Sequence, residues 1–116
     1  MKLTGKCREE FEKWQNDCNW FEDLNIYNEN YTNIEIFYTL TPSMQYGVLV
    51  DYFNSVKIHL EIQNRVIGWN NKDIEYRPCY TTQEGVDFGI HFKAIPEART
   101  QAIEKADELR NEVLNK

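Results

Sequence analysis

The sequence predicts an α+β domain in two layers, with an antiparallel sheet of about four strands packed against N-terminal, central and C-terminal helices. Three observations support this class. Apolar residues recur at helical spacing near both ends, they alternate in two segments of the second half, and short turn sequences separate the presumed strands. At 116 residues, of which 41% are hydrophobic, the chain is long enough for one core and too short for two. We therefore expect a single domain over residues 1–116.

The N-terminal segment has the spacing of an amphipathic helix, with Thr4 as candidate N-cap. Residues 19–33 lose this periodicity and are rich in Asn and aromatic residues, which predicts a long ordered loop. Residues 34–40 alternate weakly, so their pattern allows either a short strand or a continuation of the loop. The apolar positions of the helix, at steps of 4, 3 and 4, are Cys7, Phe11, Trp14 and Cys18.

Two further helices are predicted. Thr41 and Pro42 are a typical helix start, because the hydroxyl can cap the first turn and proline at the first position loses no hydrogen bond. Apolar residues then share one helical face over 42–54, whereas a strand there would mix a carboxylate with large apolar side chains. Pro96 opens the last helix, whose narrow apolar stripe consists of Ala98, Ala102, Ala106, Leu109 and Val113.

Two segments have the strict alternation of strands with one buried and one solvated face. They are residues 56–62 and 86–92, and in each the apolar side chains occupy every second position. This pattern predicts that the apolar side chains of both strands face the core.

Two less regular strands are predicted between them. Gln63 and Asn64 indicate a tight turn into a strand at 65–69, and residues 70–73 indicate a second turn into a strand at 74–80. Pro78 suggests that the latter is an edge strand or ends there, because proline cannot donate to a ladder.

The charge balance argues against two classes of partner. With 13 Lys and Arg against 19 Asp and Glu, the formal net charge is -6, whereas direct binding of nucleic acid or of anionic lipid depends on clustered cations. The sequence has no signal-peptide-like stretch or membrane-spanning run, and its three cysteines lack metal-ligand spacing. We therefore expect a cytoplasmic protein without a cofactor that contacts neither nucleic acid nor membrane directly.

Two histidines are the main candidates for chemistry. His59 and His91 fall on the polar sides of their predicted strands, where with Glu61 they could form a metal or acid–base site. Two histidines and a carboxylate fall on a solvated face through alternation alone, and this is the favoured interpretation. Cys79 could pair with His91 as a thiolate, but no cationic helix N-terminus adjoins it, which favours an inert thiol. The sequence therefore predicts a protein that is not an enzyme.

The least random feature is a run of 43 residues between Lys13 and Lys57 without Lys, Arg or His. Its first part interleaves acidic, aromatic and Asn residues, a composition that can steer toward a basic partner and anchor on aromatic rings. An equally weighted alternative is a solubilising loop whose aromatic side chains fold inward onto the core. The candidate protein-binding residues are Trp20, Phe21, Glu22, Asp23, Tyr27, Glu29, Tyr31 and Glu35.

Four segments, taken in order, carry a resemblance to a known family. They are LTGK at 3–6, FEKW at 11–14, SMQYGVLVDYFNSV at 43–56 and EARTQAIEKA at 97–106. Together they resemble a family of small, uncharacterised proteins encoded by bacteriophages and prophages. The resemblance covers the first, central and last predicted helices and implies no established activity.

What the resemblance implies is a phage setting, in the cytoplasm of a bacterial host cell. By analogy with small acidic phage proteins that act on host proteins, the implied function is a non-enzymatic inhibitor. The partner would be a host protein with a basic nucleic-acid-binding surface, such as a CRISPR effector. The alternative is a phage structural or assembly accessory protein.

Overall fold

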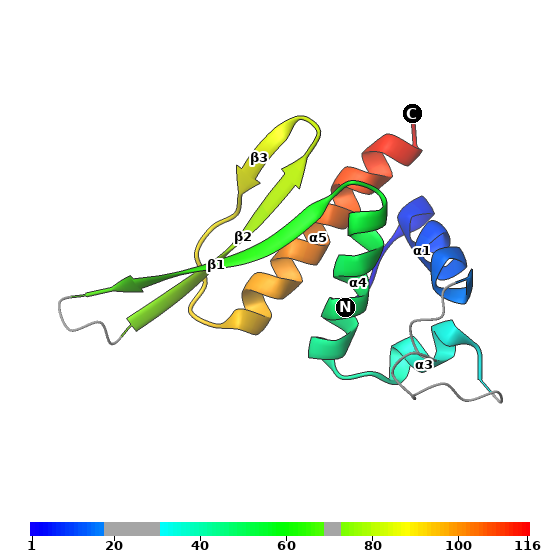
Figure 1. Cartoon of the computed structure of the whole chain (residues 1–116), viewed down its shortest axis with the longest axis horizontal. Helices are drawn as coiled ribbons and strands as arrows, with labels where there is room; N and C mark the ends of the chain where they lie inside the picture. Colours follow the sequence, from blue (N-terminus) through cyan, green and yellow to red (C-terminus); the bar gives the residue numbers. More distant parts are fainter. Residues whose placement is uncertain (18–30, 69–72) are drawn as a thin grey trace.

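The computed structural model describes residues 1–17, 31–68 and 73–116 (Figure 1). Within these ranges the chain forms four helices and an antiparallel sheet of three strands in the order β1-β2-β3, which confirms the α+β class. None of the helices in these ranges has both the length and the apolar character needed to cross a bilayer. The elements are α1 (Gly5–Asp17), α3 (Asn33–Thr39), α4 (Pro42–Ser55), β1 (His59–Ile67), β2 (Asp73–Thr82), β3 (Gly85–Phe88) and α5 (Ile95–Leu114).

Helices α4 and α5 lie on one face of the sheet. Helix α5 packs across β1 and β2, and α4 packs beside α5 and against β1. Helices α1 and α3 contact one another at one end of the molecule, while the far half of the β1–β2 hairpin extends at the other end (Figure 1). The predicted two-layer arrangement of helices on a sheet is therefore present.

The N-terminus of α1 is capped by α5 and not, as predicted, by Thr4. The Thr4 hydroxyl and backbone N–H donate hydrogen bonds to the two carboxylate oxygens of Asp107, at 2.6 and 2.9 Å. The side-chain oxygen of Asn111 accepts from the backbone N–H of Cys7 at 3.0 Å. Gly5 has a φ of 55°, and an added Cβ would lie 3.0 Å from that oxygen, so this approach of α5 requires glycine. The Asn111 side chain of another helix thus replaces the local cap, and the Asp107 carboxylate holds Thr4 beside it.

Residues 34–39 lie in helix α3 and form neither a strand nor a loop, and Leu40 is the C-cap of this helix. The Thr32 hydroxyl caps this helix by accepting from the Glu35 backbone N–H at 3.2 Å. Ile36 and Phe37 are buried and fix α3 to the core. The helix has only seven residues, so its periodicity is too short to stand out from weak alternation.

Helices α4 and α5 confirm the sequence prediction. Thr41 Oγ1 accepts from the Met44 backbone N–H, and a proline occupies the first turn of each helix. The expectation that Val113 is buried is wrong, since it is exposed whereas Leu114 packs against the core. Consecutive helical residues are about 100° apart, which places the two side chains in different directions. The fully buried alanines of the α5 stripe are Ala98, Ala102 and Ala106.

The sheet has three strands because two predicted strands are one. Residues 59–67 of β1 pair without interruption with residues 81–73 of β2, so Gln63 and Asn64 lie inside a strand and make no turn. Gln63 is held there by the Arg77 guanidinium, which donates two hydrogen bonds to its side-chain oxygen at 3.2 and 3.1 Å. The predicted tip residues 69–72 lie outside the described ranges.

Pro78 lies inside the central strand β2 and not at an edge or strand end. Its carbonyl accepts from Gly89 N–H at 2.9 Å, so its missing N–H would also have pointed toward β3. Strand β3 ends at Phe88, which pairs with Cys79, and the next pair is Tyr76 with Phe92. Residues 76–79 of β2 therefore lie opposite residues 88–92, a segment with one extra residue. This β-bulge removes the demand for a donor at the proline.

The two faces of the sheet differ in what covers them. Leu60 and Tyr80 pair on the face that contacts the helices, which we call the helix face. The opposite, open face carries the odd-numbered residues of β1 and their partners, and within the described ranges no helix lies on it (Figure 1). Val86 and Phe88 fall on the open face and are exposed, which contradicts their predicted burial. The alternation correctly predicted which side chains share a face of the sheet. It does not identify the face that the helices cover.

The core is built mainly between the helices. Phe11 of α1 is at its centre, with ring centroids 4.9 Å from Phe37 of α3 and 5.3 Å from Tyr52 of α4. Trp14 of α1 is half-buried and stacks against Phe11 at 6.1 Å. The described core therefore joins elements from both ends of the chain.

Candidate functional site

Most of the predicted binding surface lies outside the described ranges. Trp20, Phe21, Glu22, Asp23, Tyr27 and Glu29 belong to residues 18–30, as does Cys18 of the predicted first helix, and the structure tests none of these predictions. Tyr31 and Glu35, the other two predicted binding residues, are described and lie at the start of α3.

The described part of this surface combines aromatic and acidic side chains. Tyr31 is 56% exposed and Tyr38 is 45% exposed, and Glu35 is exposed in the first turn of α3. Glu12 of α1 lies beside Tyr38, since its carboxylate accepts from the Tyr38 hydroxyl at 3.4 Å. We call the surface of Glu12, Tyr31, Glu35 and Tyr38 the acidic pole; it lies at the α1–α3 end of the molecule (Figure 1).

The buried side of α3 explains why this surface points outward. Ile36 and Phe37 occupy consecutive positions that pack inward, and the Phe37 ring meets Phe11 edge to face. Glu35 and Tyr38 lie on either side of them and are left toward solvent. Partial burial raises the pKa of Tyr38, and the neighbouring Glu12 carboxylate raises it further, so its hydroxyl stays protonated. The exposed Tyr31 side chain does not fold inward onto the core, so the alternative of a solubilising loop with buried aromatic residues is wrong for this residue.

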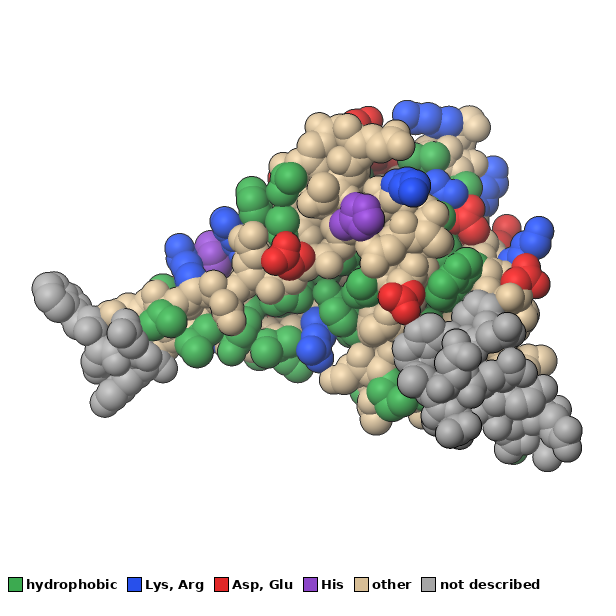
Figure 2. All heavy atoms as spheres, viewed as in Figure 1, with side chains coloured by type: hydrophobic (Ala, Val, Ile, Leu, Met, Phe, Trp, Pro, Cys, Tyr) green, Lys and Arg blue, Asp and Glu red, His purple; other side chains and the backbone are tan. Residues whose placement is uncertain are grey.

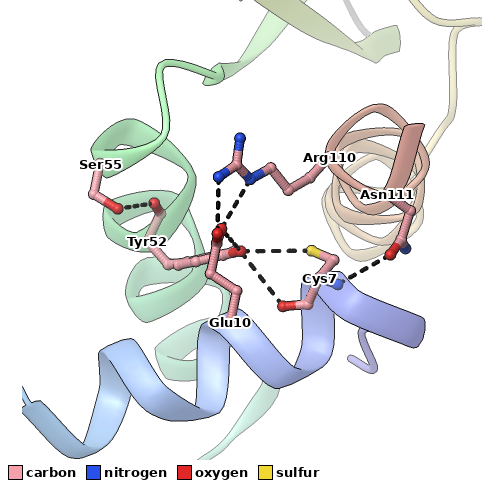
Figure 3. Close-up of polar contacts among 6 residues, drawn as sticks. All are labelled: Cys7, Glu10, Tyr52, Ser55, Arg110 and Asn111. Atoms are coloured by element: carbon pink, nitrogen blue, oxygen red, sulfur yellow. Dashed lines mark hydrogen bonds and ion pairs between the residues drawn. The ribbon is translucent and has the colours of Figure 1, made fainter. Parts of the chain in front are cut away.

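A second group of polar residues links α1, α4 and α5 (Figure 3). The Arg110 guanidinium donates two hydrogen bonds to the Glu10 carboxylate, both at 2.8 Å, and the Tyr52 hydroxyl donates to the same carboxylate at 2.7 Å. The Cys7 thiol lies 3.7 Å from the Tyr52 hydroxyl. We call Cys7, Glu10, Tyr52 and Arg110 the helix clamp.

The helix clamp is arranged for stability and not for nucleophilic chemistry. Burial raises the pKa of Cys7 to about 12 and raises the pKa of Tyr52 well above its ordinary range, so both groups remain neutral at physiological pH. The Arg110 hydrogen bonds outweigh partial burial and lower the pKa of Glu10. The carboxylate is therefore ionised and held by two partners, as in a structural ion pair.

The clamp predicts a specific pH dependence of stability. Because the pKa of folded Glu10 lies below its ordinary value of 4.5, its contribution is complete above that value and is lost as the pH falls through the folded pKa. We expect Glu10→Gln to lower the free energy of unfolding by about 1–2 kcal/mol at neutral pH. Urea denaturation at a series of pH values measures this difference.

The difference between wild type and Glu10→Gln should shrink as the pH falls below 4.5. Glu9→Gln, a change at the neighbouring exposed position, is the control and should show a smaller difference. A Glu10→Gln difference that is constant from neutral to acid pH would contradict the assignment of the charge to the clamp.

The two histidines are not brought together. His59 lies at the first position of β1, where its ring nitrogen Nδ1 is 2.6 Å from the Asn54 side-chain oxygen. His91 lies instead beside Gln63 and Arg77. Gln63 is four residues along β1 from His59, a separation of roughly 13 Å in a strand. The described ranges contain no group of three His, Cys, Asp or Glu side chains placed to hold a metal ion.

Cys79 is buried beneath the open face, opposite Phe88 of β3. Burial raises the pKa of its thiol, so the reactive thiolate is disfavoured. This supports the interpretation of Cys79 as an inert thiol.

A further surface, which the sequence patterns did not single out, is the free half of the β1–β2 hairpin. We call residues 63–67 and 73–77 the arm; it extends past the end of β3 (Figure 1). Val66 and Ile74 pair on the helix face of the arm and are 53% and 42% exposed. Figure 2 shows hydrophobic side chains along the length of the arm. Large apolar groups gathered on a surface are typical of an interaction site.

A cleft separates the arm from the helices. It has a volume of 370 Å³ and lies between α4, the start of α5 and the helix face of β1 and β2. The Arg99 guanidinium borders it, 5.2 Å from the centre of the Tyr46 ring and 3.0 Å from the Ser43 hydroxyl. The cleft is mainly apolar, and the lining residues include Tyr46, Val50, Leu60, Ile62, Tyr76 and Ile95.

A smaller hollow of 130 Å³ on the open face is lined by Gln63, Arg65, Arg77 and His91. Both of its guanidinium groups are engaged within the chain. Arg65 pairs with Glu75 at 3.1 Å, and Arg77 binds Gln63 and lies 4.1 Å from the centre of the Phe88 ring. The guanidinium groups that line the hollow therefore already have partners within the chain.

The fold defines a small α+β protein with two distinct exposed surfaces, the acidic pole and the arm. Comparisons with protein-family models, with curated proteins and with solved structures find no match to this chain. The resemblance to phage proteins stays a prediction.

Proposed function

We propose that this chain is a non-enzymatic binding protein of phage type, which inhibits a host defence factor by occupying its basic nucleic-acid-binding surface. The observation that carries the proposal is the acidic pole, where Tyr31 and Tyr38 are exposed beside Glu35 and Glu12. Aromatic rings on a surface are effective anchors in protein interfaces, because they bury a large area at a low cost in side-chain entropy.

Charge favours a basic partner for this surface. The net charge is -6, and no Lys, Arg or His occurs between Lys13 and Lys57, a stretch that contains all of α3 and α4. Arg8, a cation beside this surface, is already paired with Glu12 at 3.0 Å. An acidic, aromatic surface is complementary to a channel that binds phosphates through Lys and Arg. A CRISPR effector is the specific partner that we propose.

Binding to a panel of purified CRISPR effectors tests the proposal. We expect a complex with at least one effector in size-exclusion chromatography, and weaker binding of guide or target nucleic acid by that effector. The association rate should fall as salt is raised, because electrostatic steering is screened. Absence of a complex with every effector of the panel would remove this partner.

Substitutions in the acidic pole should weaken binding without unfolding the chain. We expect Tyr31→Ala to cost about 2 kcal/mol of affinity, as an exposed aromatic anchor, and Glu35→Lys to slow association. Both residues are exposed, so the melting temperature should change little. Surface plasmon resonance and thermal melts measure the two effects separately.

Glu97→Lys is the matched control for Glu35→Lys. Each glutamate is exposed in the first turn of a helix, so both changes place a cation at the same unfavourable end of a helix dipole. Only Glu35 belongs to the acidic pole. Equal slowing of association by both variants would show that net charge matters and that the pole does not.

The alternative function, a phage structural or assembly accessory protein, gives a different result. The chain would then be recovered with purified virions. Effector binding would be detected neither for wild type nor for the variants with tyrosine substitutions at the pole.

A further inference from the structure

The strand β1 has an unpaired edge with an unusual distribution of charge. In the described ranges β1 pairs with β2 on one side and with no strand on the other. Exposed strand edges invite pairing with another chain, and proteins commonly protect them with charged side chains, above all Lys. Here the exposed charged residues are of opposite sign, Glu61 and Arg65, two residues on either side of Gln63.

This spacing makes the edge complementary to itself. When two copies of β1 lie antiparallel about Gln63, residue 61 of each copy is opposite residue 65 of the other. Two Glu61–Arg65 pairs then form on the open face, related by the symmetry axis, as an isologous contact requires. Directly opposite charges stabilise an antiparallel pair of strands, whereas like charges destabilise it.

The intrachain contacts leave Arg65 able to take this role. Its Nη2 atom donates to Glu75 on β2 at 3.1 Å, and its side chain is 55% exposed. A guanidinium has five N–H donors, so Arg65 can bind Glu75 on one side and Glu61 of a second copy on the other.

The helix face is complementary in the same register. Leu60 of one copy falls opposite Val66 of the other, so the exposed Val66 meets an apolar partner. Leu60 and Ile62 border the 370 Å³ cleft, which leaves space beside this part of β1. The Val66–Ile74 pair of the second copy would enter that space and lose its contact with water.

We propose that β1 pairs with β1 of a second copy of this chain, antiparallel about Gln63, and joins two three-stranded sheets into one sheet of six strands. Charge on the open face and apolar contact on the helix face select the same register. The proposal concerns the arm and does not depend on what the acidic pole binds.

Paired charge reversals test the register directly. Sedimentation velocity from micromolar to millimolar concentration should show wild type in a monomer–dimer equilibrium. Glu61→Arg alone places Arg opposite Arg65, and Arg65→Glu alone places Glu opposite Glu61, so each should weaken dimerisation about tenfold or more. Mixed together, the two variants restore both opposite-charge pairs, and we expect them to form a heterodimer.

Mixing the two variants distinguishes an effect on strand pairing between copies from an effect on the stability of each copy. Arg65→Glu also breaks the Arg65–Glu75 ion pair, but mixing cannot repair that contact within the chain. Glu84→Arg, the same change at an exposed position in the β2–β3 turn, is the control and should leave dimerisation unchanged. If Arg65→Glu does not fold, Glu61→Arg compared with Glu84→Arg still decides the question.

A disulfide tests the axis itself. Directly opposite residues of antiparallel strands have Cα atoms roughly 4.5–5.5 Å apart, within the range of a disulfide. In a background with Cys18 replaced by Ser, Gln63→Cys should crosslink two copies on oxidation, and His59→Cys should not. A monomeric wild type, a mixture without heterodimer, or equal crosslinking at both positions would overturn the proposal.

Discussion

Replacing Phe11 by Ala is expected to lower the free energy of unfolding by about 3–5 kcal/mol, the usual cost of truncating a large core side chain. Phe11 is fully buried, and its ring contacts aromatic rings of three elements, namely Trp14 of α1, Phe37 of α3 and Tyr52 of α4. The rigid helices around it cannot close the cavity completely, so the cost includes more than the lost transfer energy. Urea denaturation followed by circular dichroism measures it.

Trp14→Ala is the informative comparison. The sequence places Trp14 on the same apolar stripe as Phe11, which predicts a similar loss. In the structure Trp14 is only half-buried, so we expect its replacement to cost clearly less than that of Phe11. An equal or larger effect of Trp14→Ala would mean that the centre of the core lies nearer to the C-terminal end of α1.

The second large effect is expected for Asp107→Ala, at about 2–3 kcal/mol. Asp107 is buried and accepts hydrogen bonds from the Thr4 backbone, from the Thr4 hydroxyl and from Asn111. Its removal leaves two donors of Thr4 without their partner and takes a negative charge from the N-terminal end of α1. Thermal and urea unfolding would show the loss.

Two variants show whether the lost hydrogen bonds or the lost charge lowers the stability of Asp107→Ala. Asp107→Asn keeps a side-chain oxygen and should cost less than Asp107→Ala. Glu108→Ala removes a neighbouring carboxylate that is mostly exposed and pairs only with Lys105 at 3.5 Å among the contacts described, so it should change stability by less than about 0.5 kcal/mol. A loss from Glu108→Ala as large as that from Asp107→Ala would point to the charge of α5 and not to the cap.

Elements with a long, regular pattern were predictable from the sequence. The stripes of α1 and α5 and the Thr-Pro start of α4 each repeat one signal over several turns or combine two signals. The short helix α3 offers two turns, too few for helical spacing to differ from weak alternation. The predicted turn at Gln63 and Asn64 failed because a cross-strand partner, Arg77, satisfies an amide that local composition assigns to a turn.

Long-range contacts set the limit for the rest. The contacts that α5 makes at the start of α1, Asp107 with Thr4 and Asn111 with Cys7, join residues 103 and 104 apart, and no local pattern contains them. For the binding surface, charge and aromatic content indicated Tyr31 and Glu35, which are exposed. No sequence pattern indicated the arm. Alternation in residues 56–62 and 86–92 indicates two faces, whereas the length by which β1 and β2 extend beyond β3 depends on the assembled fold.

The cap between α1 and α5 also bears on how the chain acquires its fold during synthesis. A ribosome releases the N-terminus first, so α1 emerges long before the Asp107 and Asn111 side chains that complete its first turn. Until then a helix of 13 residues is marginal in water, and its first turn lacks these partners even where α3 and α4 already cover Phe11. The first turn of α1 is therefore completed only after the last helix has been synthesised, and this delay gives chaperones access to the N-terminal end of α1.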